Sequence, residues 1–175
     1  MIKKHLGWIF VIGFIGVAVA IIWESYSVSY AEHSDTSHQK APNFELANLD
    51  GDKVRLNDST GKIRIVDFWA TWCPPCRAEI PHFNALTSKY PDLVILGIAL
   101  DREGPSVLKP FAKEYNIQYP LLIGNSETVQ AFGDIQSIPT TFVIDQAGYI
   151  IKKYVGYRPQ SVFEADIKQL SEAGI

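Results

Sequence analysis

The chain has 175 residues and a formal net charge of −3; 47% of its residues are hydrophobic and 20% are charged. This length and apolar content suit one globular domain with an ordinary core. The slightly negative charge offers no electrostatic basis for binding nucleic acid, so we expect no nucleic-acid partner.

The chain begins with an apolar segment. Lys3 and Lys4 precede a run from Leu6 to Trp23 that contains no charged residue. About 18 residues span roughly 27 Å as a helix, which is enough to cross a hydrocarbon core. The two lysines indicate a cytoplasmic N-terminus under the positive-inside rule. Residues 1–23 are therefore predicted to be a transmembrane anchor, which makes the chain a single-pass cell-membrane protein with its remaining residues on the extracytoplasmic side.

A cleaved signal peptide is the alternative to an anchor, because Ser29-Tyr30-Ala31 is an acceptable small-x-small cleavage site. The apolar run is longer than the usual signal-peptide core, and this site lies well beyond its end, so we favour the anchor. Both alternatives export the domain. Residues 24–40 are polar and serine-rich, which predicts a flexible tether that keeps the domain near the membrane.

The folded domain is predicted to cover residues 41–175. Apolar residues alternate on both sides of the segment 48–52, in which Asp50-Gly51 is a hairpin signal. An apolar, β-branched run from Lys62 to Trp69 then predicts a buried strand.

The only two cysteines, Cys73 and Cys76, follow this strand. Residues 77–90 have helical spacing, so the cysteines stand where a strand ends and a helix begins. The positive end of a helix stabilises a thiolate and lowers the pKa of the first cysteine, which makes Cys73 the predicted nucleophile. Cys76 is close enough to close a disulfide. The pattern predicts a redox-active disulfide, and we expect neither a metal nor a further cofactor.

Three other interpretations of the cysteine pair are weaker. A zinc site needs two more ligands, and the chain has no second cysteine pair. A purely structural disulfide would close a loop so small that it contributes only about 2 kcal/mol. The third interpretation is two inert thiols that share this spacing by chance.

Strand and helix patterns alternate through the rest of the chain. The predicted strands are 93–100, 119–123, 140–144 and 149–155, and the predicted helices are 106–115, 126–132 and 159–170. Gly148 supplies the backbone freedom that a hairpin turn between the last two strands needs. Pro81 should kink the helix after Cys76, and Pro110 weakens the first turn of the helix at 106–115. This order predicts an α/β fold, a mixed sheet flanked by helices.

The segment Phe68-Trp69-Ala70-Thr71-Trp72-Cys73-Pro74-Pro75-Cys76-Arg77-Ala78-Glu79 resembles the active site of membrane-anchored thioredoxin-like thiol–disulfide oxidoreductases of bacteria, the TlpA/ResA type. The resemblance covers about residues 41–169 and implies a thioredoxin-like fold. It also implies that the chain reduces disulfides outside the cytoplasm, as such proteins often do in cytochrome c maturation. The implied partners are exported proteins with disulfides, apocytochrome c foremost, and a membrane-embedded thiol-electron donor.

The resemblance also implies a substrate surface beside the disulfide. Ile138-Pro139 resembles the motif in which thioredoxin-like folds place a cis-proline against the disulfide, where nearby backbone groups can pair with an extended substrate. Trp72, Pro74 and Pro75 are expected to complete this surface. The alternatives are an ordinary trans proline that starts a strand and a tryptophan that belongs to the core.

Two carboxylates are candidates for proton chemistry. Asp67 interrupts an apolar strand, where burial should raise its pKa and suit it to accept a proton from Cys76. Thioredoxin has aspartate at this offset, whereas TlpA/ResA-type proteins often have asparagine. Glu79 follows Cys76 by three residues, as an acidic residue does in ResA-like proteins, where it tunes the thiols. The alternatives are a structural aspartate and an acid favoured in the first turn of a helix.

The sequence thus predicts an extracytoplasmic thiol–disulfide oxidoreductase that works as a reductant, in which Cys73 attacks a substrate disulfide and Cys76 resolves the mixed disulfide. The alternatives are a disulfide-forming oxidant and a non-enzymatic binding module for exported proteins. A peroxidase of the peroxiredoxin type fits less well, because that site uses a lone peroxidatic cysteine with a threonine upstream.

Overall fold

The computed structural model describes residues 39–172. The predicted anchor at residues 1–23 and all but the last two residues of the predicted tether lie outside that range. Within residues 39–172, none of the helices combines the length and the hydropathy that a membrane span requires.

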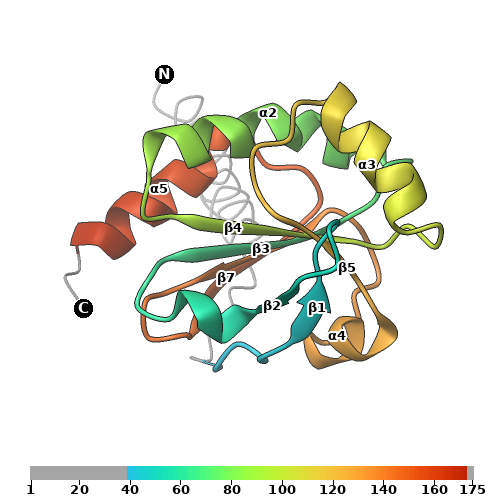
Figure 1. Cartoon of the computed structure of the whole chain (residues 1–175). Helices are drawn as coiled ribbons and strands as arrows, with labels where there is room; N and C mark the ends of the chain where they lie inside the picture. Colours follow the sequence, from blue (N-terminus) through green and yellow to red (C-terminus); the bar gives the residue numbers. More distant parts are fainter. Residues whose placement is uncertain (1–38, 173–175) are drawn as a thin grey trace, which may run out of the picture. The chain divides into compact units, whose positions relative to one another are not determined.

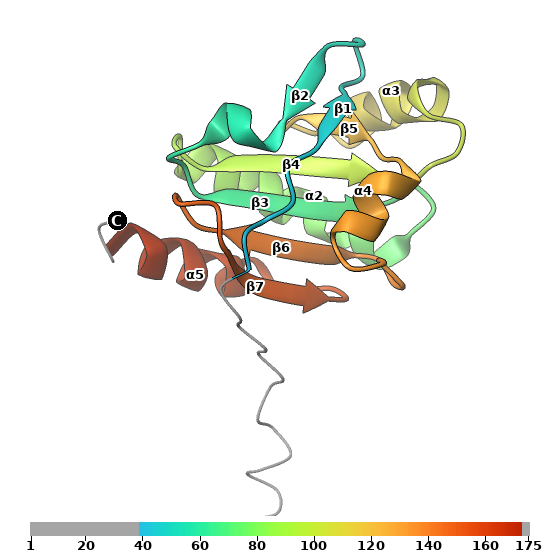
Figure 2. The same cartoon turned by 90° about the horizontal axis from the view of Figure 1, so that it is seen from below.

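A five-stranded sheet in the order β5-β4-β3-β6-β7 forms the centre of the domain (Figure 2). Every residue of the middle strand β3 (Arg64–Trp69) is buried. It pairs in parallel with β4 (Val94–Ala99) and antiparallel with β6 (Thr140–Ile144). The edge strands are β5 (Leu121–Ile123), parallel to β4, and β7 (Ile150–Val155), antiparallel to β6. The predicted mixed sheet is therefore confirmed.

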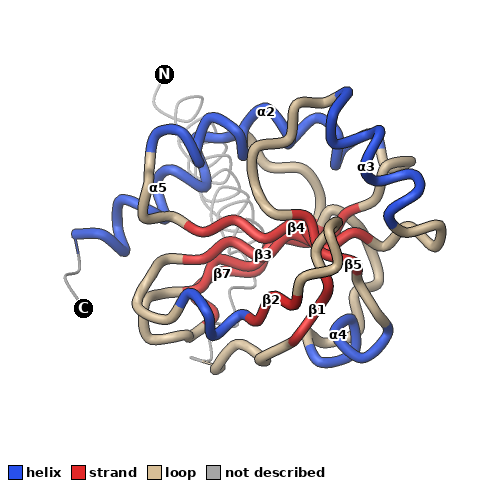
Figure 3. Tube along the Cα trace, in the orientation of Figure 1, coloured by secondary structure: helices blue, strands red, loops and turns tan. Residues whose placement is uncertain are grey.

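Helices cover one face of the sheet, and a helix with a small hairpin covers the other (Figures 1 and 3). The first face carries α2 (Pro74–Lys89), α3 (Pro105–Glu114) and α5 (Gln160–Glu172), whose apolar side chains form one core cluster. The second cluster lies on the opposite face, where α4 (Ser126–Ala131) packs. Two apolar layers thus enclose β3, as expected of a strand that is buried on both faces.

The hairpin predicted around residues 48–52 is present. It joins β1 (Glu45–Ala47) to β2 (Lys53–Arg55), and Gly51 adopts a φ of +95° in the turn, a conformation that favours glycine. The 3₁₀ turn η1 (Leu56–Ser59) follows and buries Leu56 against the second cluster. The second predicted turn, between β6 and β7, places Gly148 at a φ of +94°.

Three boundaries differ from the sequence prediction. Helix α2 begins at Pro74, three residues before the predicted start, because Cys73 is its N-cap and prolines are tolerated in a first turn that needs no N–H donors. Helix α3 starts at Pro105 and includes Pro110, so its first turn does form. Gln39 already belongs to the folded domain, because its carbonyl oxygen accepts from the Ile150 N–H at 2.9 Å.

Candidate active site

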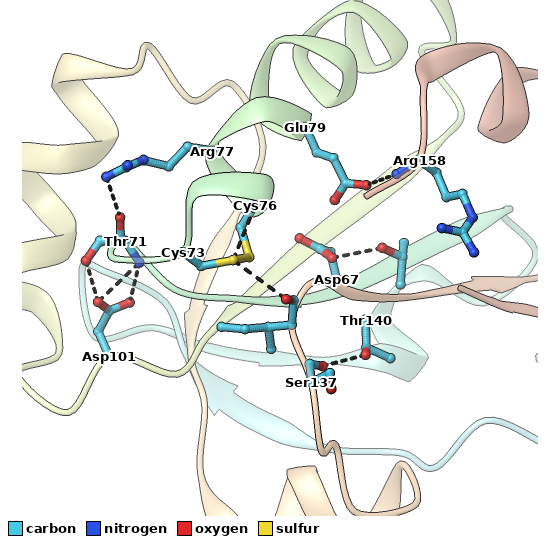
Figure 4. The surroundings of a disulfide bond; sticks show 12 residues. Asp67, Thr71, Cys73, Cys76, Arg77, Glu79, Asp101, Ser137, Thr140 and Arg158 are labelled. Atoms are coloured by element: carbon cyan, nitrogen blue, oxygen red, sulfur yellow. Dashed lines mark hydrogen bonds between the residues drawn. A yellow bond between two sulfur atoms is a disulfide. The ribbon is translucent and has the colours of Figure 1, made fainter. Parts of the chain in front are cut away.

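The two cysteines form a disulfide at the point where β3 passes into α2 (Figure 4). Their Cα atoms are 5.3 Å apart, and both side chains are buried. The Cys76 N–H, in the first turn of α2, donates to the Cys73 sulfur at 3.3 Å. After reduction, the same N–H and the helix dipole would stabilise a thiolate on Cys73. The geometry therefore favours Cys73 as the attacking sulfur.

The predicted cis-proline lies against the disulfide. The peptide bond between Ile138 and Pro139 is cis, and the Ile138 carbonyl oxygen is 3.8 Å from the Cys73 sulfur. The Pro139 carbonyl oxygen accepts from the Gly156 N–H at 2.7 Å, which joins this loop to the end of β7. The structure thus brings together two segments that are separated by more than sixty residues in the sequence.

Large exposed hydrophobic side chains occur directly before Cys73 and around the end of β7. Among residues 39–172 they are Trp72, Val155 and Tyr157, with exposed fractions of 65%, 50% and 42%. Trp72 directly precedes Cys73. Val155 and Tyr157 flank Gly156, which is bonded to the cis-proline loop. Together with the exposed Pro74 and Pro75, Trp72 forms an apolar surface from which a substrate could reach Cys73.

Sequence reasoning did not identify Val155 or Tyr157 as exposed apolar residues. Their position depends on the pairing of Val155 with Thr140, the residue after the cis-proline. The hairpin of β6 and β7 was predicted, but the exposure of these residues depends on β7 being an edge strand, and strand order leaves no local signal.

Asp67 is buried in β3 and 2% exposed. It stands opposite Thr141 in the sheet, and the Thr141 hydroxyl donates to its Oδ1 at 2.9 Å. Burial raises the pKa of Asp67 well above its ordinary value, and the neighbouring charge of Glu79 raises it further, while the Thr141 hydrogen bond opposes the shift. Asp67 is thus suited to hold or accept a proton beside the disulfide.

Glu79 lies on the same side of the disulfide as Asp67 but belongs to α2 (Figure 4). Its side chain is fully buried, and its Oε1 accepts from the Arg158 N–H at 2.6 Å. Its other oxygen has no hydrogen-bond partner among residues 39–172. Burial raises the pKa of Glu79 to about 7, against the opposing hydrogen bond and charge of Arg158. Glu79 can therefore exchange a proton near neutral pH.

Asp101 is a residue of this site that sequence reasoning missed. It follows β4 and is 7% exposed, and its carboxylate accepts from both the N–H and the hydroxyl of Thr71 (Figure 4). The available signal was its position: an acid directly after a buried strand lies at the carboxyl edge of a parallel sheet, where sites are common.

Comparisons with known proteins agree with this geometry. The model of the AhpC/TSA family matches residues 38–153. Thiol-disulfide oxidoreductase ResA from Bacillus cereus is 32% identical over 134 residues, which cover 76% of this chain and 78% of that protein. Thioredoxin-like protein YneN from Bacillus subtilis is 33% identical over 159 residues, 89% of this chain and 92% of that protein.

A solved structure is also similar to this chain. The crystal structure of a thiol:disulfide interchange protein of the thioredoxin family from Chlorobium tepidum TLS matches with a TM-score of 0.70 and 34% identity. The match covers 78% of this chain and 99% of that chain. The thioredoxin-like fold, the Cys73–Cys76 disulfide and these relatives lead to one conclusion: the chain belongs to the AhpC/TSA family and is a thiol–disulfide oxidoreductase of the ResA type.

Proposed function

We propose that the chain works as an extracytoplasmic reductant, anchored in the cell membrane by residues 1–23, that reduces disulfides in exported proteins. The observation that carries the direction is the pair of buried acids, Asp67 and Glu79, beside the disulfide. A disulfide becomes a strong oxidant when its reduced, thiolate form is stabilised. In their ionised form these acids disfavour a nearby thiolate through like-charge repulsion, which favours the reducing direction.

In the proposed reaction, the Cys73 thiolate attacks one sulfur of a substrate disulfide. A mixed disulfide forms, and the other substrate sulfur leaves as a thiolate. Cys76 then gives its proton to the Asp67 carboxylate and attacks the Cys73 sulfur. This step restores the Cys73–Cys76 disulfide and releases the second substrate sulfur. Two electrons pass to the substrate, and Asp67 returns its proton to solvent or to a product thiolate.

The substrate is proposed to lie across the apolar surface around the disulfide. Trp72, Pro74 and Pro75 would contact it from the side of α2, while Ile138 and Pro139 would offer backbone groups beside Cys73. The 3.8 Å separation between the Ile138 carbonyl oxygen and the Cys73 sulfur supports this placement, because a segment bound there lies within reach of the nucleophile.

The reductant must be recharged, because dithiols outside the cytoplasm become oxidised unless electrons are delivered to them. We therefore include a membrane-embedded thiol-electron donor in the proposal. The substrate class is exported proteins whose cysteines must be reduced, with apocytochrome c foremost. The resemblance of the active-site segment to the TlpA/ResA type supports both parts of the proposal. The uncharged run from Leu6 to Trp23 behind two lysines supports a position beside a membrane donor.

The reduction potential tests the direction of electron flow. The full-length chain in detergent is equilibrated with thiol–disulfide buffers, and the oxidised fraction is read by alkylation of the free thiols. We expect a potential nearer to about −270 mV, the value of thioredoxin, than to about −120 mV, the value of the oxidant DsbA. A value at the oxidant end would instead assign the chain to disulfide formation.

The proposed location has its own test. Intact cells are treated with a membrane-permeant reductant and then with a membrane-impermeant maleimide. We expect Cys73 to be labelled in intact cells and the chain to be recovered with the membrane fraction. Labelling that appears only after the cells are permeabilised would place the domain in the cytoplasm and overturn this part of the proposal.

A further inference from the structure

Asp101 connects the ends of two neighbouring strands. It follows β4, whose last residue, Ala99, pairs with Trp69 at the end of β3. The Leu100 N–H donates to the Trp69 carbonyl oxygen at 2.9 Å, which holds the two chain segments together just before they diverge. From this position the Asp101 side chain, which is 7% exposed, reaches the segment that leads to Cys73.

That segment is held through Thr71. The Thr71 N–H lies 3.2 and 3.1 Å from the two carboxylate oxygens of Asp101, and the Thr71 hydroxyl donates to Oδ1. The Thr71 carbonyl oxygen accepts from Arg77 Nη1 at 3.4 Å, so the peptide groups on both sides of this residue are bonded. Hydrogen bonds to an ionised acceptor are among the stronger ones in proteins.

We propose that Asp101 is a positioning residue: by holding Thr71, it fixes the short segment that carries Trp72 and Cys73 and thereby aims the Cys73 sulfur at the substrate. The Cys73 N–H donates to the Ala70 carbonyl oxygen at 3.2 Å, so Thr71 stands inside the turn that presents the nucleophile. A nucleophile that is held in place reacts faster, because little orientational freedom remains to be lost in the transition state.

The chain contains a matched control for this role. Asp145 is also buried, at 8% exposed, and its Oδ1 accepts from the Tyr149 N–H at 2.7 Å. It follows β6, which runs antiparallel to β3, so it lies at the edge of the sheet opposite to the disulfide. Replacing Asp145 therefore removes a comparable buried carboxylate without touching the segment that leads to Cys73.

The experiment measures the rate at which Cys73 attacks a small aromatic disulfide, in the reduced full-length chain with Cys76→Ser. We compare three single variants with this parent chain: Asp101→Asn, Thr71→Val and Thr71→Ser. A double variant combines Asp101→Asn with Thr71→Val. We expect Asp101→Asn and Thr71→Val each to lower the rate constant about ten-fold, with no further loss in the double variant. Thr71→Ser keeps the hydroxyl and should react like the parent chain, as should Asp145→Asn.

The pH dependence of Cys73 alkylation is measured on the same variants. It separates a misplaced sulfur, which lowers the limiting rate, from a change in the fraction of thiolate. Urea unfolding midpoints show that each variant is folded during the measurement. The inference fails if Thr71→Ser is as slow as Thr71→Val, if the two losses multiply in the double variant, or if the rates do not change.

The inference rests on the proposed function only through the role of Cys73 as attacking sulfur. Attack on a small disulfide proceeds whether the chain reduces or oxidises its partners in the cell. A reduction potential at the oxidant end would therefore overturn the reductant proposal and leave this inference intact. Unchanged rates in the Thr71 and Asp101 variants would overturn this inference alone.

Discussion

The central strand β3 buries two charged residues, Arg64 at its start and Asp67 nearer the disulfide, and the surroundings of the two side chains differ. Arg64 is 1% exposed, and its Nη2 donates hydrogen bonds to the carbonyl oxygens of Asp145 and Gln146 in the turn between β6 and β7. Nearer the disulfide, Asp67 accepts from the Thr141 hydroxyl and lies close enough to Glu79 for their charges to interact.

This contrast distinguishes a buried charge that stabilises the fold from buried acids that can take part in proton transfer. Burial lowers the pKa of Arg64, but a guanidinium keeps its proton at any physiological pH, so its hydrogen bonds to the turn are permanent. Burial raises the pKa of both Asp67 and Glu79, that of Glu79 to about 7, and an acid whose pKa lies near neutrality, as that of Glu79 does, can gain and lose a proton. We expect substitutions near the start of β3 to change stability and those near the disulfide to change reactivity.

The largest expected effect is at the cysteines. Cys73→Ser should abolish disulfide exchange, because a serine hydroxyl does not ionise at physiological pH and cannot form a mixed disulfide. Cys76→Ser should retain the attack but accumulate mixed disulfides, because the resolving sulfur is missing. Non-reducing electrophoresis of each variant with substrate measures the trapped species. Equal trapping by both variants would contradict the assignment of Cys73 as the attacking sulfur.

Asp67→Asn should slow the complete exchange reaction by about 100-fold at pH 7, because the amide cannot accept a proton from Cys76. The effect should shrink as the pH rises above about 8.5, where a thiol ionises without help. Stopped-flow rates between pH 6 and 10 measure it, with Asp58→Asn as a control in a surface turn. A loss of rate that is the same at every pH would make Asp67 a structural residue.

Arg64→Met should lower the free energy of unfolding by about 2–3 kcal/mol, because it removes the hydrogen bonds that the buried guanidinium donates to the Asp145 and Gln146 carbonyl oxygens. The exchange rate of the folded variant should not change. Urea unfolding and the exchange assay test the two parts, with the exposed Lys62→Met as control. If the variant lost exchange rate while it remained folded, the two ends of β3 would be coupled and the comparison would fail.

Glu79→Gln should change how stability depends on pH. The folded-state pKa of Glu79 is about 7, above its ordinary value of 4.5, so the wild-type chain loses stability as the pH rises from about 4.5 through 7. The variant lacks this loss, so it should gain up to about 3 kcal/mol relative to the wild type between pH 4 and pH 8. Urea unfolding at several pH values measures the difference.

Glu164 provides a control of opposite sign. Hydrogen bonds from Gln160 and Lys89 lower its pKa, so its contribution to stability is present at neutral pH and is lost as the pH falls. Glu164→Gln should therefore destabilise the chain more at pH 7 than at pH 4. If Glu79→Gln showed this same trend, the raised pKa of Glu79 would be wrong.

The elements and the redox pair could be predicted from the sequence alone. Hydrophobic periodicity and β-branched runs located every strand of the main sheet, and Gly51 and Gly148 marked turns that need positive φ. The position of the cysteines between a strand and a helix also followed from local patterns. The start of α2 was missed, because Pro74 and Pro75 resemble helix breakers unless they are recognised as first-turn residues.

The surroundings of the disulfide, in contrast, are set by tertiary contacts. Asp101 reaches Thr71 because β3 and β4 are parallel neighbours that end at one edge. The N–H that holds Glu79 comes from Arg158, on the loop before α5. Such contacts depend on strand order and register, which are set by packing between residues far apart in the chain. Local sequence patterns carry little of that information.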